Sequence, residues 1–70
     1  MRVLVLEDDA DLRDSLVEVL NFEGFIADGV SSLSSYRAWM TTHSCEVLIA
    51  DRYLEDGDGL DAVAHFKKST

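Results

Sequence analysis

The 70-residue chain has few of the residues that stabilise small proteins through covalent cross-links or structural metals. Its single cysteine, Cys45, excludes an internal disulfide, and one cysteine with two histidines argues against a zinc finger. Apolar runs are only a few residues long, whereas roughly 20 apolar residues are needed to cross a bilayer. Residues 1–7 contain no long apolar segment and no small-residue cleavage site, so we expect no signal peptide and a cytoplasmic location.

Basic residues are also scarce, because 6 lysines and arginines stand against 14 acidic residues and give a net charge of −8. A nucleic-acid-binding surface needs lysine and arginine to neutralise phosphates, so we expect no direct nucleic-acid binding by this segment. The acidic balance leaves open a metal cation, a basic protein partner, or a solvated surface that keeps a small protein soluble. With 47% apolar residues, the composition fits one small domain over residues 1–70.

Short apolar runs alternate with helical patterns along the chain. The pattern predicts strands at 3–6, 25–27 and 47–50, and helices at 11–22, from 31–35 to about 42, and at 60–68. A turn at 28–29 is expected to close the second strand, and residues 51–59, with four acids and two glycines, are expected to form a loop. The order βαβαβα predicts an open α/β fold with a parallel sheet, right-handed crossovers and helices on both faces.

Acidic residues follow two of the predicted strands directly. Glu7 and Asp8 come after the first strand, and Asp51 comes after the third. Ligands of open α/β sheets collect outside the carboxyl ends of the strands, so the three carboxylates meet at one edge if these strands are neighbours. Clustered carboxylates raise one another's pKa unless a cation lies between them, and an all-oxygen cluster suits Mg²⁺. Alternatively, these acids face solvent, or Asp8 or Asp9 caps a helix.

Three segments, taken together, resemble the receiver domain of two-component response regulators. They are VLVLEDD at residues 3–9, followed by Leu12 and Arg13; FEGF at 22–25; and VLIAD at 47–51, followed by Leu54 and by DGL at 58–60. The last segment fits the family pattern D-x-x-[LM]-P-x-x-[DS]-G-[LIM] with one departure, since Glu55 stands at the usual proline. The resemblance implies a flavodoxin-like fold truncated to its first three β/α units, a partial receiver domain over 1–70 with strand order 2-1-3.

The resemblance also implies roles for individual residues. Asp51 is implied to accept a phosphoryl group from a sensor histidine kinase. The implied Mg²⁺ ligands are Asp8, Asp51 and the backbone carbonyl of Tyr53, with Glu7 acting through a metal-bound water. Asp9 is expected to begin a helix rather than to bind the metal. Such a domain is a signalling switch rather than an enzyme, and at most it assists its own phosphorylation and dephosphorylation.

Two other functions remain open from the sequence. The chain ends after the third predicted helix, before the strands that carry the family's serine or threonine and its lysine. A phosphorylation-incompetent receiver would serve as an interaction or dimerisation module, and strand 47–50 would expose an apolar edge of the kind that pairs with other chains. A homo-oligomer through that strand or through the helices is therefore expected. The second alternative is a generic acidic binder of divalent cations.

We expect structural rather than functional roles for three further residues and one loop. His43 and His65 are expected to be surface residues, and Cys45 is expected to be a small packing residue. The acidic run at 56–59 does not align with the EF-hand calcium loop.

Overall fold

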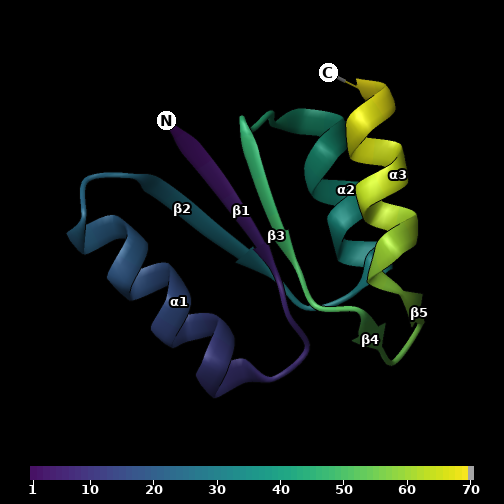
Figure 1. Ribbon diagram of the computed structural model, residues 1–70, viewed down its shortest axis with the longest axis horizontal. Coiled ribbons are helices and arrows are strands. Elements are labelled where there is room, and N and C mark those ends of the chain that lie inside the picture. The colour runs from purple at the N-terminus through teal and green to yellow at the C-terminus, as the bar shows by residue number, and fades with distance from the viewer. Residues whose placement is uncertain (70) are drawn as a thin grey trace.

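The structure, a computed structural model, describes residues 1–69 (Figure 1). The elements in chain order are β1 (Arg2–Leu6), α1 (Ala10–Phe22), β2 (Ile26–Val30), α2 (Leu33–Thr42), β3 (Val47–Ala50), β4 (Tyr53–Leu54), β5 (Gly57–Asp58) and α3 (Gly59–Ser69). The six predicted elements are all present, and β4 and β5 are additional. Within these residues no helix has the length and apolar character needed to span a membrane.

The three longer strands form a parallel sheet in the order β2-β1-β3, which confirms the predicted topology. The central strand β1 pairs with β2 along its whole length and with β3 from Val3 to Leu6. Residues 3–6 are almost completely buried, because β1 has a strand on each side and helices on both faces. In Figure 1, α1 covers one face of the sheet, while α2 and α3 lie on the other. The expected α/β arrangement, the first three β/α units of a flavodoxin-like fold, is therefore confirmed.

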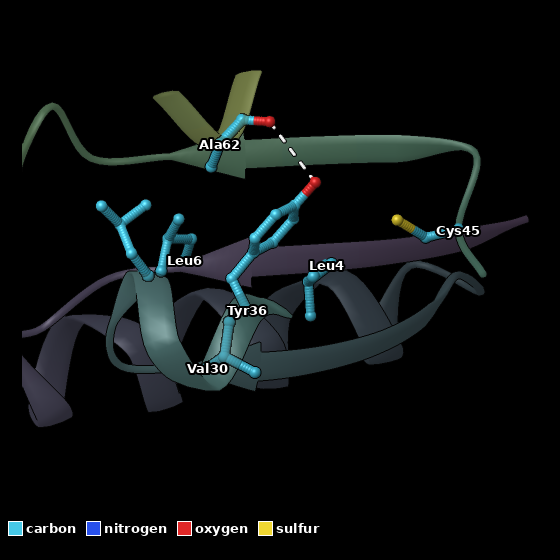
Figure 2. Packing of buried hydrophobic residues seen from close by; sticks show 7 residues of the cluster. Leu4, Leu6, Val30, Tyr36, Cys45 and Ala62 are labelled. Atoms are coloured by element: carbon cyan, nitrogen blue, oxygen red, sulfur yellow. Dashed lines mark hydrogen bonds between the residues drawn. The ribbon is translucent and has the colours of Figure 1, made fainter. Parts of the chain in front are cut away.

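The larger part of the core lies between the sheet and the pair α2 and α3 (Figure 2). Its buried members are Leu4, Leu6, Val30, Leu33, Tyr36, Cys45 and Ala62. The Tyr36 hydroxyl donates to the Ala62 carbonyl at 3.4 Å and lies 2.8 Å from Nδ1 of His65. His65 is exposed as expected, but this contact gives it a role in joining α2 to α3 that the sequence did not indicate.

The predicted second strand, at 25–27 with a turn at 28–29, was wrong at its C-terminal end, because β2 continues through both turn residues. Gly29 lies inside the strand, where α1 packs against it. A Cβ atom on Gly29 would lie 2.8 Å from Cγ of Arg13 and 3.2 Å from Cγ2 of Val17. The glycine therefore makes room for α1 and does not end the strand.

The predicted loop at 51–59 contains an antiparallel hairpin instead of irregular structure throughout. Strands β4 and β5 pair Tyr53 with Asp58 and Leu54 with Gly57, so only residues 55–56 form the turn. Because Gly59 already belongs to α3, the chain passes from the end of β3 to the next helix through a short, ordered connection.

Candidate functional site

Glu7, Asp8 and Asp51 come together at the carboxyl edge of the sheet. Glu7 and Asp8 follow β1, Asp51 follows β3, and these two strands are neighbours in the sheet. Each of the three side chains offers a carboxylate oxygen within 4.8 Å of the other two. The expected convergence of three acids that are up to 44 residues apart in sequence is thus a property of the fold, since parallel strands end at the same edge.

Backbone hydrogen bonds continue the sheet into this site. The N–H of Asp51 donates to the carbonyl of Leu6 at 2.9 Å, and the N–H of Glu7 donates to the carbonyl of Val30 at 3.0 Å. Both acids are therefore held in the register of the strands that precede them. This placement is more rigid than a loop provides, and sites on rigid elements keep a more precise geometry.

Glu7 is the buried acid of the cluster, with 8% of its surface exposed. The N–H of Asp9 donates to Glu7 Oε2 at 3.1 Å, and this hydrogen bond alone would lower the pKa of the carboxyl. Burial, the adjacent Asp8 side chain and the charge of Asp51 act in the opposite direction and raise the pKa of Glu7 above its ordinary value of 4.5. Three carboxylates held this close repel one another, so a cation between them would be stabilising.

The start of α1 is fixed next to the cluster by two side chains. Asp9 accepts a hydrogen bond from the N–H of Leu12 at 3.1 Å and is the N-cap, which confirms its expected role at the helix start. Nη1 of Arg13 donates to the carbonyl of Glu7 at 2.9 Å. Arg13 thereby ties the first turn of α1 to the end of β1, and Asp8 is left exposed at the rim of the site.

The hairpin that follows Asp51 carries the predicted backbone ligand. Tyr53 lies in β4, two residues after Asp51, and its side chain is 75% exposed. At the base of the hairpin the carbonyl of Arg52 accepts from the N–H of Gly59 at 2.6 Å, and Nε of Arg52 lies 3.4 Å from Oδ2 of Asp58. The Tyr53 carbonyl therefore belongs to the same fixed segment as Asp51, while its role as a ligand stays a prediction.

Comparison with known families assigns residues 3–70 to the response regulator receiver domain. The chain belongs to this family. Over 69 residues the receiver is 33% identical to the virulence transcriptional regulatory protein PhoP of Salmonella typhimurium (strain 14028s / SGSC 2262) and 29% identical to the transcriptional regulatory protein PmrA of Pectobacterium parmentieri. These alignments cover 99% of this chain and 31% of each relative, so the chain spans about a third of the length of the curated relatives it matches.

Residue 59 of the receiver is a glycine for a steric reason that the sequence pattern does not reveal. A Cβ atom on this residue would overlap the backbone carbonyl of Asp51. The first turn of α3 can therefore lie against the Asp51 backbone only because residue 59 has no side chain. Asp58, just before it, accepts the N–H of Leu60 at 2.9 Å and so caps the same helix.

Sequence reasoning missed Asp56, which lies in the turn of the hairpin. Its Oδ1 accepts from the N–H of Leu33 at 2.9 Å and its Oδ2 accepts from the N–H of Ser34 at 3.0 Å. These two backbone hydrogen bonds lower the pKa of the Asp56 carboxyl below its ordinary value of 3.8. No local spacing could have indicated the contact, because its partners are 22 and 23 residues away in the chain.

Proposed function

We propose that this receiver accepts a phosphoryl group from a sensor histidine kinase on Asp51, with Mg²⁺ held by Asp8, Asp51 and the carbonyl of Tyr53. Glu7 would act through a metal-bound water. The proposal is carried by the convergence of three carboxylates within 4.8 Å at the edge shared by β1 and β3. This donor set fits Mg²⁺, which prefers oxygen ligands and is commonly bound by one or two carboxylates together with phosphate oxygens.

In the proposed reaction a carboxylate oxygen of Asp51 attacks the phosphorus of phosphohistidine in line. A P–O bond to Asp51 forms as the P–N bond breaks, and the electron pair of that bond remains on the imidazole nitrogen. Bound Mg²⁺ would offset the repulsion between the anionic nucleophile and the phosphoryl oxygens. The contribution of the protein is positioning, because the Asp51 N–H is held by Leu6 and the Glu7 carboxylate is oriented by the N–H of Asp9.

As a signalling domain, the receiver would act only on its own aspartyl phosphate and would not be a metabolic enzyme. We also propose a cytoplasmic location for it. Its charge of −8 supports the absence of direct nucleic-acid contact by this segment, since it offers few groups to neutralise phosphates.

Intact-mass spectrometry after incubation with acetyl phosphate and Mg²⁺ tests the proposal. We expect the wild-type chain to gain one phosphoryl group, and we expect EDTA or the substitution Asp51→Asn to abolish the gain. Asp61→Asn, which removes an exposed acid from the first turn of α3, is the matched control and should leave the gain intact. A folded wild-type sample that gains nothing in the presence of Mg²⁺ would contradict the proposal.

A second candidate function, an interaction module that is not phosphorylated, is favoured by the outer edge of β3. In the described part of the chain this edge pairs with no further strand, and Ile49 on it is 39% exposed. Unpaired apolar edges of this kind associate with other chains, so this function predicts a homo-oligomer formed through β3 or the helices. Light scattering should then detect an oligomer that Asp51→Asn leaves intact and that Ile49→Lys dissociates. A folded monomer at high concentration would refute the homo-oligomer.

A generic binder of divalent cations gives a third pattern in the same experiments. Mg²⁺ and Ca²⁺ would both stabilise the fold, and acetyl phosphate would add no phosphoryl group.

A further inference from the structure

The tip of the β4–β5 hairpin is attached to the first turn of α2. Besides the two hydrogen bonds from Leu33 and Ser34 to Asp56, Gly57 lies directly against this turn. Gly57 has a φ of +150°, and a Cβ atom on it would lie 2.6 Å from Cδ1 of Leu33. The hairpin turn and the helix start are therefore in both polar and steric contact.

The backbone N–H groups in the first turn of α2 donate to two different side chains. Ser32 is the N-cap, and its Oγ accepts from the N–H of Ser35 at 3.0 Å in a reciprocal capping arrangement. The N–H groups of Leu33 and Ser34 are left for an acceptor outside the helix, and the Asp56 carboxylate supplies it. A negative charge at this position is also favoured by the helix dipole. The helix thus provides a fixed point for the hairpin turn.

The opposite end of the hairpin is attached to α3. Gly59 donates to the Arg52 carbonyl, and Asp58 contacts both Arg52 and the N–H of Leu60. Tyr53 lies between this base and the Asp56 turn, paired with Asp58. The backbone of Tyr53 therefore lies between attachments at both ends of the hairpin, and the Asp56 attachment is the one that reaches α2.

We propose that Asp56 is a positioning residue of the metal site, which holds the Tyr53 carbonyl in place by binding the first turn of α2. This inference rests on the proposed function, because it assumes Mg²⁺ at the acidic cluster. Outer groups that orient metal ligands typically account for about 10–100-fold in metal affinity, and we expect about tenfold weaker Mg²⁺ binding when Asp56 is replaced by alanine. Coupling is reciprocal, so Mg²⁺ binding also perturbs the first turn of α2.

Backbone-amide NMR of the 70-residue chain during titration with MgCl₂ tests both parts of this proposal. In the wild type we expect the Leu33 and Ser34 amide signals to shift with the same saturation as that of Tyr53. In Asp56→Ala we expect the Tyr53 signal to report about tenfold weaker binding, at the lower end of the range for such outer groups. The Leu33 and Ser34 signals of this variant should no longer respond to the metal.

Two matched variants test whether a loss of Mg²⁺ affinity comes from lost positioning, from the change of charge or from the lower stability of α2. Glu55→Gln removes a neighbouring negative charge from the same turn, and Ser32→Ala removes the other cap of α2. Both should bind Mg²⁺ with nearly wild-type affinity, although Ser32→Ala lowers stability. Asp56→Asn keeps one acceptor oxygen, so its affinity should lie between those of Glu55→Gln and Asp56→Ala. It also serves as the test if the alanine variant does not fold.

The outcomes distinguish failure of this inference from failure of the metal site itself. Unchanged Mg²⁺ affinity in Asp56→Ala, or an equal loss in Glu55→Gln or Ser32→Ala, would overturn the positioning role and leave the metal site standing. Wild-type protein that shows no saturable response to Mg²⁺, or an unaltered response in Asp51→Asn, would overturn the metal site and the positioning role together.

Discussion

Substitution of Asp51 by asparagine should raise the stability of the metal-free receiver and remove most of its stabilisation by Mg²⁺. In the absence of a cation, Asp51 contributes a negative charge within 4.8 Å of carboxylate oxygens on Glu7 and Asp8. Asparagine has nearly the same shape but no charge. The variant therefore relieves repulsion in the free protein and at the same time deletes a metal ligand.

The size of the effect follows from the geometry. Two unit charges 4.8 Å apart repel by about 3.5 kcal/mol at an effective permittivity of about 20. Asp8 is exposed and Asp51 is half-buried, so solvent screening reduces the relief to about 1 kcal/mol. For a domain of this size that corresponds to a rise in Tm of about 4–8 °C. Mg²⁺ at ten times its Kd stabilises the wild type by about 1.4 kcal/mol.

Thermal unfolding followed by circular dichroism, in EDTA and in excess MgCl₂, measures both effects. We expect Asp51→Asn to have the higher Tm in EDTA and the wild type to have the higher Tm in MgCl₂. Asp14→Asn, an equal change of charge at an exposed position of α1, controls for the general effect of a charge of −8. A lower Tm for Asp51→Asn in EDTA, or equal stabilisation of both proteins by Mg²⁺, would refute the reasoning.

Three further outcomes follow from contacts elsewhere in the structure. Tyr36→Phe removes the hydroxyl between α2 and α3 and should lower the free energy of unfolding, measured in urea, by about 1 kcal/mol. Its effect should not be additive with that of His65→Ala, and additive effects would contradict the contact. The pKa of Asp56 is lowered in the folded protein, so its carboxylate contributes to stability above its ordinary pKa of 3.8, and this contribution is lost as the pH falls through the folded-state pKa. The difference in unfolding free energy between the wild type and Asp56→Asn should therefore disappear in acid and persist at neutral pH. Gly59→Ala places a methyl group against the Asp51 carbonyl and should destabilise the fold by about 1–3 kcal/mol, and a neutral result in urea unfolding would show that α3 can move away without cost.

The sheet and the acidic cluster could be predicted because both depend on simple patterns. An unbroken apolar run indicates a strand buried on both faces, and the carboxyl ends of parallel strands share an edge, which is where Glu7 and Asp51 meet. The end of β2 could not be predicted in this way. Glycine is typical of turns, and only the packing of Arg13 and Val17 against Gly29 shows that here it accommodates a helix.

The capping of α2 could likewise be predicted only in part. Serine residues near 31–35 indicated a helix start, and Ser32 does form the N-cap. Every helix start leaves several backbone N–H groups without intrahelical partners, so the sequence reveals that acceptors are needed. Which distant side chain supplies them depends on the hairpin that brings Asp56 to Leu33, and that hairpin was not predicted.

The acidity of the chain consequently has more than one physical origin. Asp9, Asp56 and Asp58 each accept backbone N–H groups at the start of a helix, and all three helices start at the carboxyl edge of the sheet. Their charges are favoured by the helix dipoles without any ligand. Glu7, Asp8 and Asp51 at the same edge converge on one another instead. Although the hydrogen bond from the Asp9 N–H acts to lower the pKa of Glu7, burial and the two neighbouring acids raise it. Two groups of acids therefore lie at this edge: the fold itself stabilises the charges of the first, and a cation would relieve the mutual repulsion of the second. This difference, rather than the net charge of −8, supports the proposed metal site.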